Sequence, residues 1–274
     1  MKDCVDAQLR DQEAGFCKDR SCTDQIATPW ISVQQSVEWN SSLYINFIDY
    51  EKVFDSVDRT TLWKLLRYYS VSQKIVNTTQ NSYDGLHCKI VHGGQLTDSF
   101  EVKTGVRQGC LLSPFHFLLV IDWIMKTSTS EGKRGIQWTS RIQLDDLDFT
   151  DYLALLSQTQ QQMQERTSVA TASAAVDLNM HKGKSRILRY NTACTNPVTI
   201  DREDLEDVKI FTYLGSIIDE QSGSDADMKA RIGKARAAYL QLKNIWNSKQ
   251  LSTNIKVRIF NTNVKTVLLY WVET

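Results

Sequence analysis

The segment Leu43-Tyr-Ile-Asn-Phe-Ile-Asp49 decides the fold, because its pattern predicts a strand that ends in an acidic residue. Alternate residues share one face of a strand, so a mostly apolar row of side chains ends at Asp49. Downstream, Asp58 predicts a helix N-cap. The apolar residues after it follow helical spacing: Leu62, Leu65, Leu66 and Tyr69.

A second carboxylate, Asp151, lies at the expected tip of a hairpin formed by Leu144 to Leu156. Two carboxylates at the ends of adjacent strands can bind Mg²⁺ and leave positions open for substrate phosphates. A pair of such ions can activate one oxygen and stabilise a leaving one in an in-line displacement. Either aspartate alone is more typical of a turn or a helix cap than of a metal site, so the hypothesis depends on the surrounding motifs.

The remaining pattern mixes helices and strands without a regular alternation, which indicates an α+β fold. Gly93-Gly94 predicts a hairpin turn between two strands, and Ser113-Pro114 predicts the start of a buried helix. Further strands are expected at Ser185 to Arg189 and Lys209 to Ile218. Further helices are expected at Gln158 to Val176, Ala226 to Trp246 and Asn254 to Tyr270.

The charge of the 274 residues is balanced overall but uneven along the chain. With 32 basic and 32 acidic residues, the formal net charge is zero, which excludes a globally basic nucleic-acid coat. Asp201 to Asp227 carries nine acids, whereas Lys229 to Thr274 carries nine bases and one acid. A basic stretch of this kind fits a nucleic-acid footprint, but charge alone favours a solvated helix face.

The cysteines and the chain ends indicate an intracellular protein, in the nucleus or the cytoplasm. The six cysteines form no CxxC pair, and the polar N-terminus is no signal peptide, so we expect free thiols. His87, Cys88 and His92 are interpreted as strand residues rather than zinc ligands, because a fourth ligand is missing. The abrupt charged start and the apolar end predict a fragment of a longer polypeptide.

Six segments, in this order, resemble the motifs of reverse transcriptases. They are Ala14-Gly-Phe-Cys-Lys-Asp-Arg-Ser21 before motif A, Asn46-Phe-Ile-Asp-Tyr-Glu-Lys-Val-Phe-Asp-Ser-Val-Asp-Arg59 (A), Gly105-Val-Arg-Gln-Gly-Cys-Leu-Leu-Ser-Pro114 (B), Leu147-Asp-Phe-Thr-Asp-Tyr-Leu-Ala-Leu-Leu-Ser157 (C), His181-Lys-Gly-Lys-Ser185 (D) and Phe211-Thr-Tyr-Leu-Gly-Ser216 (E). Each motif alone is weak, but the six together are specific. The sequences of these motifs are similar to those of the RTE-type branch of non-LTR retrotransposons, and the resemblance covers nearly the whole chain.

The resemblance implies a right-hand polymerase with an incomplete thumb, in a truncated copy of the element. We expect residues 1–40 and 58–108 in the fingers, 41–57 and 109–223 in the palm, and 224–274 at the start of the thumb. The implied activity is RNA-directed DNA synthesis with Mg²⁺, or Mn²⁺ in its place. The implied partners are an RNA template, a DNA primer and deoxynucleoside triphosphates, with no membrane; the oligomeric state stays open.

The resemblance also implies roles for single residues around the two aspartates. Asp49 matches the first metal-binding aspartate, and Asp151 matches the first aspartate of motif C. Phe54 matches the aromatic gate that excludes a ribose 2′-hydroxyl, with a core phenylalanine as the alternative. Gln108 and Gly109 match the loop that contacts the incoming nucleotide, where glycine permits close backbone approach. A turn that leads into a helix is the simpler interpretation of these two.

Basic residues complete the implied site. Lys18 and Arg20 match finger positions that could bind the triphosphate, with an exposed loop as the alternative. Lys184 matches the motif D lysine, a candidate proton donor to pyrophosphate, and Lys182 is its competitor. Expected contacts with nucleic acid lie in motif E, which is the primer grip of the family, and in the basic stretch of residues 229–274: Tyr213, Leu214, Gly215, Arg231, Lys234 and Arg236.

One departure from the family pattern bears directly on activity. Tyr152 stands where the second aspartate of motif C is usual, and a phenol cannot replace a carboxylate as a charged Mg²⁺ ligand at neutral pH. Asp145, Asp146 and Asp148 fall on the incoming strand, where a register shift would be needed to replace it. We therefore expect impaired nucleotidyl transfer; the alternative is a catalytically dead palm, or an element relic, that at most binds nucleic acid.

Overall fold

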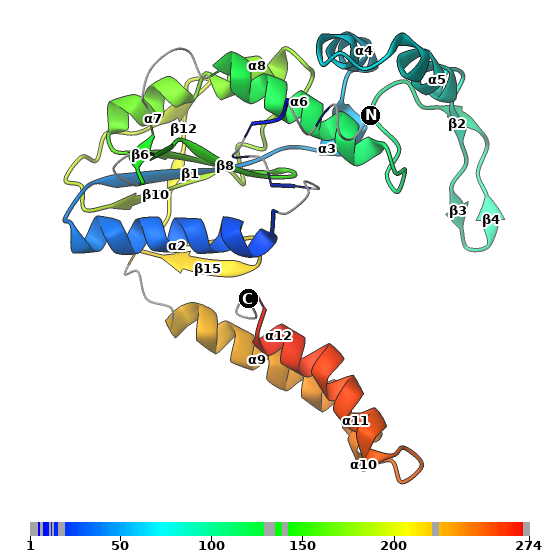
Figure 1. Ribbon diagram of the computed structural model, residues 1–274, viewed down its shortest axis with the longest axis vertical. Helices are drawn as coiled ribbons and strands as arrows, with labels where there is room; N and C mark the ends of the chain where they lie inside the picture. Colours follow the sequence, from blue (N-terminus) through cyan, green and yellow to red (C-terminus); the bar gives the residue numbers. More distant parts are fainter. Residues whose placement is uncertain are drawn as a thin grey trace.

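A five-stranded sheet of order β13-β10-β1-β9-β8 forms the centre of the computed structural model (Figure 1). The structure describes Val5 and residues 8–10, 12, 14–15, 20–128, 135–138, 142–220 and 225–270. The strands are β1 (Leu43–Asp49), β8 (Asp146–Phe149), β9 (Tyr152–Ser157), β10 (Arg186–Tyr190) and β13 (Glu206–Asp207). The strand expected at Leu43 to Asp49 is confirmed, and it lies between its two antiparallel neighbours β9 and β10.

Both faces of β1 are buried, because its alternate side chains enter two separate cores. Tyr44 and Ile48 pack in one core, whereas Ile45 and Phe47 pack in the other. Helix α2 (Cys22–Glu38) lies along the second face. Helices α6 (Ser113–Ser128), α7 (Gln160–Arg166) and α8 (Val169–Ala174) lie over the first face (Figure 1). The helix expected over Gln158 to Val176 is therefore two short helices.

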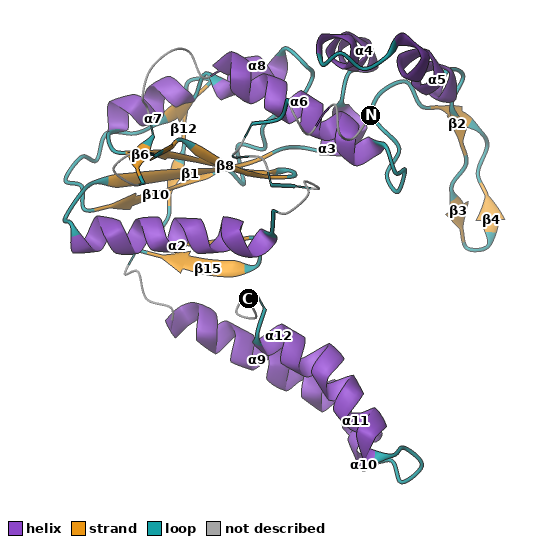
Figure 2. Ribbon diagram, viewed as in Figure 1, coloured by secondary structure: helices purple, strands orange, loops and turns teal. Residues whose placement is uncertain are grey.

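A helical segment with a projecting ribbon extends from one side of the sheet (Figure 2). It contains α3 (Val53–Ser56), α4 (Arg59–Tyr68), α5 (Gln73–Tyr83), β2 (His87–Cys88), β3 (Val91–His92), β4 (Gln95–Leu96) and β5 (Phe100–Glu101). Asp58 caps α4 as predicted, because its carboxylate accepts from the Thr61 N–H at 2.6 Å. The hairpin turn at Gly93-Gly94 is also confirmed, with φ values of 59° and 77°.

The segment expected as a strand from Lys209 to Ile218 is a hairpin. Leu214 and Gly215 both adopt positive φ, 47° and 84°, and turn the chain between β14 (Ile210–Tyr213) and β15 (Ser216–Asp219). Four small strands complete the described sheets: β6 (Ile136–Gln137), β7 (Gln143–Leu144), β11 (Thr199–Ile200) and β12 (Glu203–Asp204).

A helical arm follows this hairpin. It contains α9 (Asp225–Gln241), α10 (Lys243–Asn247), α11 (Thr253–Phe260), the π-helical turn η1 (Asn261–Lys265) and α12 (Thr266–Leu268) (Figure 1). Among the described helices, none combines the length and the apolar character needed to cross a membrane. The described cysteines are free thiols, as expected: Cys22, Cys88, Cys110 and Cys194.

Candidate active site

Asp49 and Asp151 come together because the hairpin β8–β9 pairs with β1. Asp49, the last residue of β1, lies opposite Tyr152, the first residue of β9. Phe149 and Tyr152 close the hairpin, so Thr150 and Asp151 form its two-residue turn. Both carboxylates therefore lie at the same end of the sheet, as the sequence predicted, and both side chains are half-buried.

Of the two candidate lysines of motif D, Lys184 is the one that reaches this end of the sheet. Its Nζ lies 3.3 Å from Oδ2 of Asp49. The competing Lys182 instead pairs with Glu203 at 2.8 Å and with Asp201 at 3.8 Å. The backbone of the motif D turn is held at the same place, because the His181 N–H donates to the Asp49 carbonyl at 2.7 Å.

Tyr152 forms part of a pocket of about 430 Å³ beside Asp49, which Lys184 and Phe211 also line. Tyr152 is 38% exposed, and its ring meets that of Tyr213 edge-on at 6.3 Å between centroids. Burial, followed by the negative charges of Asp151 and Asp49, raises the pKa of the Tyr152 phenol. Since a tyrosine already ionises near pH 10, this phenol is neutral at physiological pH.

The three acids before the turn do not replace the missing carboxylate. Asp146 and Asp148 are buried on the incoming strand, and both pair with Arg10, Asp146 at 2.7 Å. Burial raises the pKa of Asp148 to about 7, despite the opposing charge of Arg10. Arg166 lies 3.9 Å from Asp145 and 3.6 Å from Asp146. These acids therefore belong to a buried ion-pair cluster, not to the metal-binding end of the sheet.

Gly15 supports the turn that carries Asp151, a role that the sequence reasoning missed. A Cβ atom on Gly15 would lie 2.7 Å from the backbone nitrogen of Thr150. Next to it, the Ala14 N–H donates to the Asp148 carbonyl at 3.0 Å. Thr150 itself has a φ of 57°, which is unusual for a β-branched residue. The glycine lies in the quoted segment before motif A, so its presence there was the only signal.

Motif B crosses over motif A at close range. The Val106 N–H donates to the Phe54 carbonyl at 2.6 Å, and a Cβ on Gly105 would lie 2.6 Å from backbone atoms of Asp55. The Phe54 ring is half-buried against Phe117, with 5.3 Å between ring centroids. The structure thus brings the candidate gate residue next to the candidate nucleotide loop.

The loop residues themselves remain accessible. The Gln108 amide lies 3.4 Å from Oδ1 of Asp55, and both side chains are exposed. Gly109 has a φ of 77° and open space where a side chain would be. Arg20 donates to the Arg10 carbonyl at 2.9 Å, whereas Lys18 lies outside the described residues.

The primer-grip prediction needs correction at Tyr213. Its side chain is fully buried and packs against Phe47 at 5.3 Å, so it stabilises the sheet and has no surface to offer a nucleic acid. Leu214 and Gly215 lie in the turn, where the Tyr270 hydroxyl donates to the Leu214 carbonyl at 3.2 Å. Gly215 is exposed. The backbone of this turn, not the tyrosine, is the part that can meet a ligand.

The basic stretch needs the same correction at Arg231. This side chain is buried, forms an ion pair with Asp227 and donates to the Tyr270 carbonyl at 2.8 Å. Asp227 in turn accepts from the Ile217 N–H at 2.8 Å, which fixes α9 on β15. Lys234 and Arg236 are exposed, so of the three predicted contacts only these two present a charged side chain to solvent.

Comparison with known proteins agrees with this geometry. Residues 1–218 match the family model described as reverse transcriptase (RNA-dependent DNA polymerase), and residues 238–270 match a domain of unknown function, DUF6451. The chain is 30% identical over 155 residues to the retrovirus-related Pol polyprotein from type-2 retrotransposable element R2DM of Drosophila melanogaster, which spans 56% of this chain. It is 28% identical over 109 residues, or 40% of this chain, to that from type-1 retrotransposable element R2 of Popillia japonica.

These curated relatives are far longer, since the matches span only 14% and 18% of their lengths. Among solved structures, apo telomerase from Candida tropicalis matches 81% of this chain and 43% of its own, with a TM-score of 0.55 and 12% identity. Telomerase from the same organism in complex with a TWJ fragment of telomeric RNA matches 98% of this chain and 44% of its own, with a TM-score of 0.53 and 12% identity. The chain therefore belongs to the reverse transcriptase family and has the right-hand polymerase fold.

Proposed function

We propose that this chain is the polymerase core of a non-LTR retrotransposon reverse transcriptase. One observation carries the proposal: the β1–β9 register brings Asp49 beside the turn that holds Asp151. The proposed reaction joins the primer 3′-oxygen to the α-phosphorus of a deoxynucleotide. The bond to the β-phosphate breaks, pyrophosphate leaves and the hydroxyl proton is lost. The R2 relatives support retrotransposon descent, while the RTE-type assignment and truncation stay predictions from the sequence.

The central sheet, from residues 41–57 and 109–223, would be the palm. Residues 58–108, which extend from one side of it (Figure 1), would be fingers together with residues 1–40, although α2 lies along the sheet itself. Residues 224–274 would begin the thumb. An RNA template and a DNA primer would lie across the end of the sheet that carries Asp49; the RNA-bound telomerase neighbour supports RNA as a partner, without a position for it.

The donor atoms at the site fit one divalent cation better than two. Asp49 and Asp151 supply carboxylates, but within the described residues no group of three or more His, Cys, Asp or Glu could hold a metal. A bound Mg²⁺ would neutralise phosphate charge and activate the attacking oxygen. Tyr152, opposite Asp49 and next to Asp151 in the chain, is a neutral phenol, and Lys184 already lies 3.3 Å from Asp49. We infer that this donor set impairs the reaction.

Primer extension on an RNA template tests the proposal. We expect the natural chain to extend a DNA primer at a small fraction of the rate of Tyr152→Asp, because the variant restores the third carboxylate. Asp49→Asn in the Tyr152→Asp background is the matched control and should abolish extension. Equal rates for the natural chain and Tyr152→Asp would contradict impairment by Tyr152.

A measurement of Mn²⁺ binding distinguishes a defect in the metal site from a defect elsewhere in the protein. Electron paramagnetic resonance of the full chain titrated with Mn²⁺ should show one tight ion, and Tyr152→Asp should show two. If Tyr152→Asp binds two ions yet extends no primer, the catalytically dead, nucleic-acid-binding alternative is favoured, and polymerase activity is rejected for this chain.

A further inference from the structure

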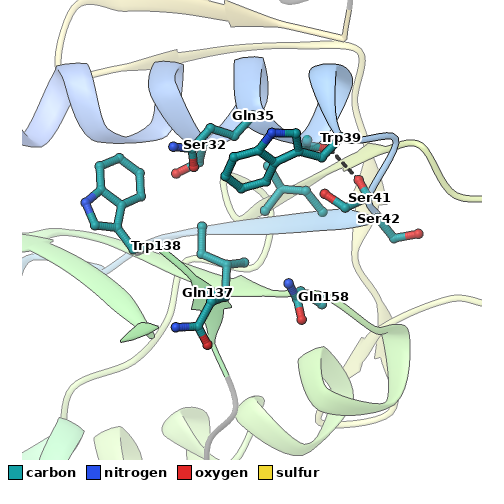
Figure 3. Close-up of a pocket in the computed structure, with 11 residues that line it drawn as sticks. Ser32, Gln35, Trp39, Ser41, Ser42, Gln137, Trp138 and Gln158 are labelled. Atoms are coloured by element: carbon teal, nitrogen blue, oxygen red, sulfur yellow. Dashed lines mark hydrogen bonds between the residues drawn. The ribbon is translucent and has the colours of Figure 1, made fainter. Parts of the chain in front are cut away.

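A second pocket lies at the other end of β1 from Asp49, where Leu43 begins the strand (Figure 3). Its volume is about 340 Å³. A strand rises about 3.3 Å per residue, so the length of β1 separates this pocket from the active site by about 20 Å. Figure 3 shows side chains of α2 along one wall, with Gln137 and Gln158 across from them.

Two tryptophans give this pocket its aromatic surface. Trp39 follows α2 directly and is 60% exposed, yet its backbone N–H donates to the Gln35 carbonyl at 2.9 Å. Trp138 is partly buried against the core, and its backbone N–H donates to the Ile142 carbonyl at 3.0 Å. A large indole face exposed on an ordered backbone is a ready surface for stacking a planar ring.

The polar groups of the pocket are uncharged. In the described part of the chain, the side-chain amides of Gln35 and Gln158 make no hydrogen bond, and Figure 3 shows them on opposite walls. The Ser32 and Ser36 hydroxyls donate to carbonyls, Ser36 to that of Ser41 at 2.6 Å. The Ser36 hydroxyl also accepts from Nδ2 of Asn191 at 3.3 Å, so Ser32 is the more available acceptor. None of the described residues that line the pocket is acidic or basic. A phosphate, carboxylate or ammonium group would therefore find no opposite charge among them.

We propose that this pocket binds one unpaired nucleobase of single-stranded RNA. A base is a planar, uncharged ring whose edges donate and accept hydrogen bonds, which matches indole faces flanked by free amides. The phosphates would remain outside in solvent. The choice of RNA rests on the proposed function. A proline-rich peptide would need an extended groove lined by aromatic residues. This pocket is instead small, about 340 Å³, and two tryptophans line it.

Binding of two 12-residue oligoribonucleotides by the full chain tests the proposal. One is oligoadenylate, and the other is an abasic strand with the same phosphates. Trp39→Ala should weaken oligoadenylate binding about 5- to 100-fold in fluorescence anisotropy, while binding of the abasic strand is unchanged. The salt dependence should also be unchanged, because no phosphate contact is lost. Trp39→Phe should keep most of the affinity.

Val37→Ala is the matched control, because Val37 is 47% exposed on the same helix but does not line the pocket. Circular dichroism checks that each variant is folded. Unchanged oligoadenylate binding by Trp39→Ala and Trp138→Ala overturns the pocket proposal alone, provided that Tyr152→Asp still extends primers. Tryptophan-dependent binding of a proline-rich peptide without RNA binding also overturns it. If the natural chain binds no RNA and no variant extends a primer, the proposed function fails too.

Discussion

Tyr152 differs from a carboxylate in charge and in hydrogen bonding, although it occupies a position directly opposite Asp49. A neutral phenol can donate a hydrogen bond, whereas a carboxylate at pH 7 only accepts. One negative charge is thereby lost from a site where Asp49 already has Lys184 as a partner at 3.3 Å. The substitution thus changes the electrostatic balance of the site while the backbone hairpin that presents Asp151 stays regular.

His116 offers a second test at the scale of one residue. It is fully buried in α6, and neither ring nitrogen has a hydrogen-bond partner in the described part of the chain. Burial lowers its pKa to about 4. An unpaired buried polar group costs about 1–3 kcal/mol, so His116→Leu should raise the free energy of unfolding by that amount at pH 7.5. Urea denaturation measures the change.

The pH dependence of this gain has a definite sign. The unfolded imidazole binds a proton below about pH 6.5, whereas the folded one binds it only near pH 4, so acidification favours the unfolded state. The advantage of His116→Leu should therefore grow between pH 6.5 and pH 4, by up to about 3 kcal/mol. A constant difference between the two proteins across that range would contradict a buried, neutral His116.

At the scale of elements, the crossing of motif B over α3 depends on a glycine. Gly105 has a φ of 76°, and an added Cβ would lie 2.6 Å from backbone atoms of Phe54 and Asp55. Gly105→Ala should destabilise the fold by at least about 2 kcal/mol, since it adds a backbone clash to left-handed strain. Thermal and urea unfolding measure the loss.

Gly109→Ala is a matched control for this effect. Gly109 has nearly the same φ, 77°, but nothing lies within 4 Å of an added Cβ. Its substitution should cost only the strain, about 1–2 kcal/mol. Equal losses at the two glycines would show that the close crossing contributes nothing to stability.

Local patterns predicted most elements, and long-range packing explains where they failed. The β1 strand, the Asp58 cap and the Gly93-Gly94 turn each follow from neighbouring residues, and each is confirmed. The turn at Leu214 was missed because leucine rarely adopts a positive φ. The Tyr270 hydroxyl, from far along the chain, donates a hydrogen bond to the Leu214 carbonyl in this turn. Arg231 was predicted to contact nucleic acid because no local pattern indicates that it is buried in an ion pair with Asp227.

The candidate site shows the same contrast between residues that local motifs predict and residues that depend on long-range contacts. The two aspartates and Lys184 were predicted from motifs and lie together, because motif spacing reflects which strands pair. The choice between Lys184 and Lys182 depended on side-chain direction, which spacing alone does not give. The supporting contact of Gly15 with Thr150 joins segments far apart in the sequence, so no local pattern could predict it.

At the scale of the whole molecule, the zero net charge hides a basic edge on the helical arm. Lys234 and Arg236 are exposed on α9, while Arg231 is buried in its ion pair. The double variant Lys234→Gln/Arg236→Gln should weaken binding of an RNA–DNA duplex and reduce the slope of log K against log salt by up to about two units. Filter binding at several salt concentrations measures the slope.

The matched control for the arm is Lys89→Gln, a neutralisation of an exposed lysine on the ribbon that extends from α5. It should leave the slope unchanged if the duplex lies along α9. An unchanged slope in the double variant would contradict a phosphate contact by these two residues and favour a solvated helix face.

The central position of β1 has a consequence for how the chain folds during synthesis. Its partners are β9 and β10, so Leu43 can pair with Tyr190 only after all the residues between them have left the ribosome. Such distant pairing slows folding and leaves apolar strand edges exposed meanwhile. The strand that ends in Asp49 is thus translated before both of its partners, and the demand for chaperones should be greatest before β10 emerges.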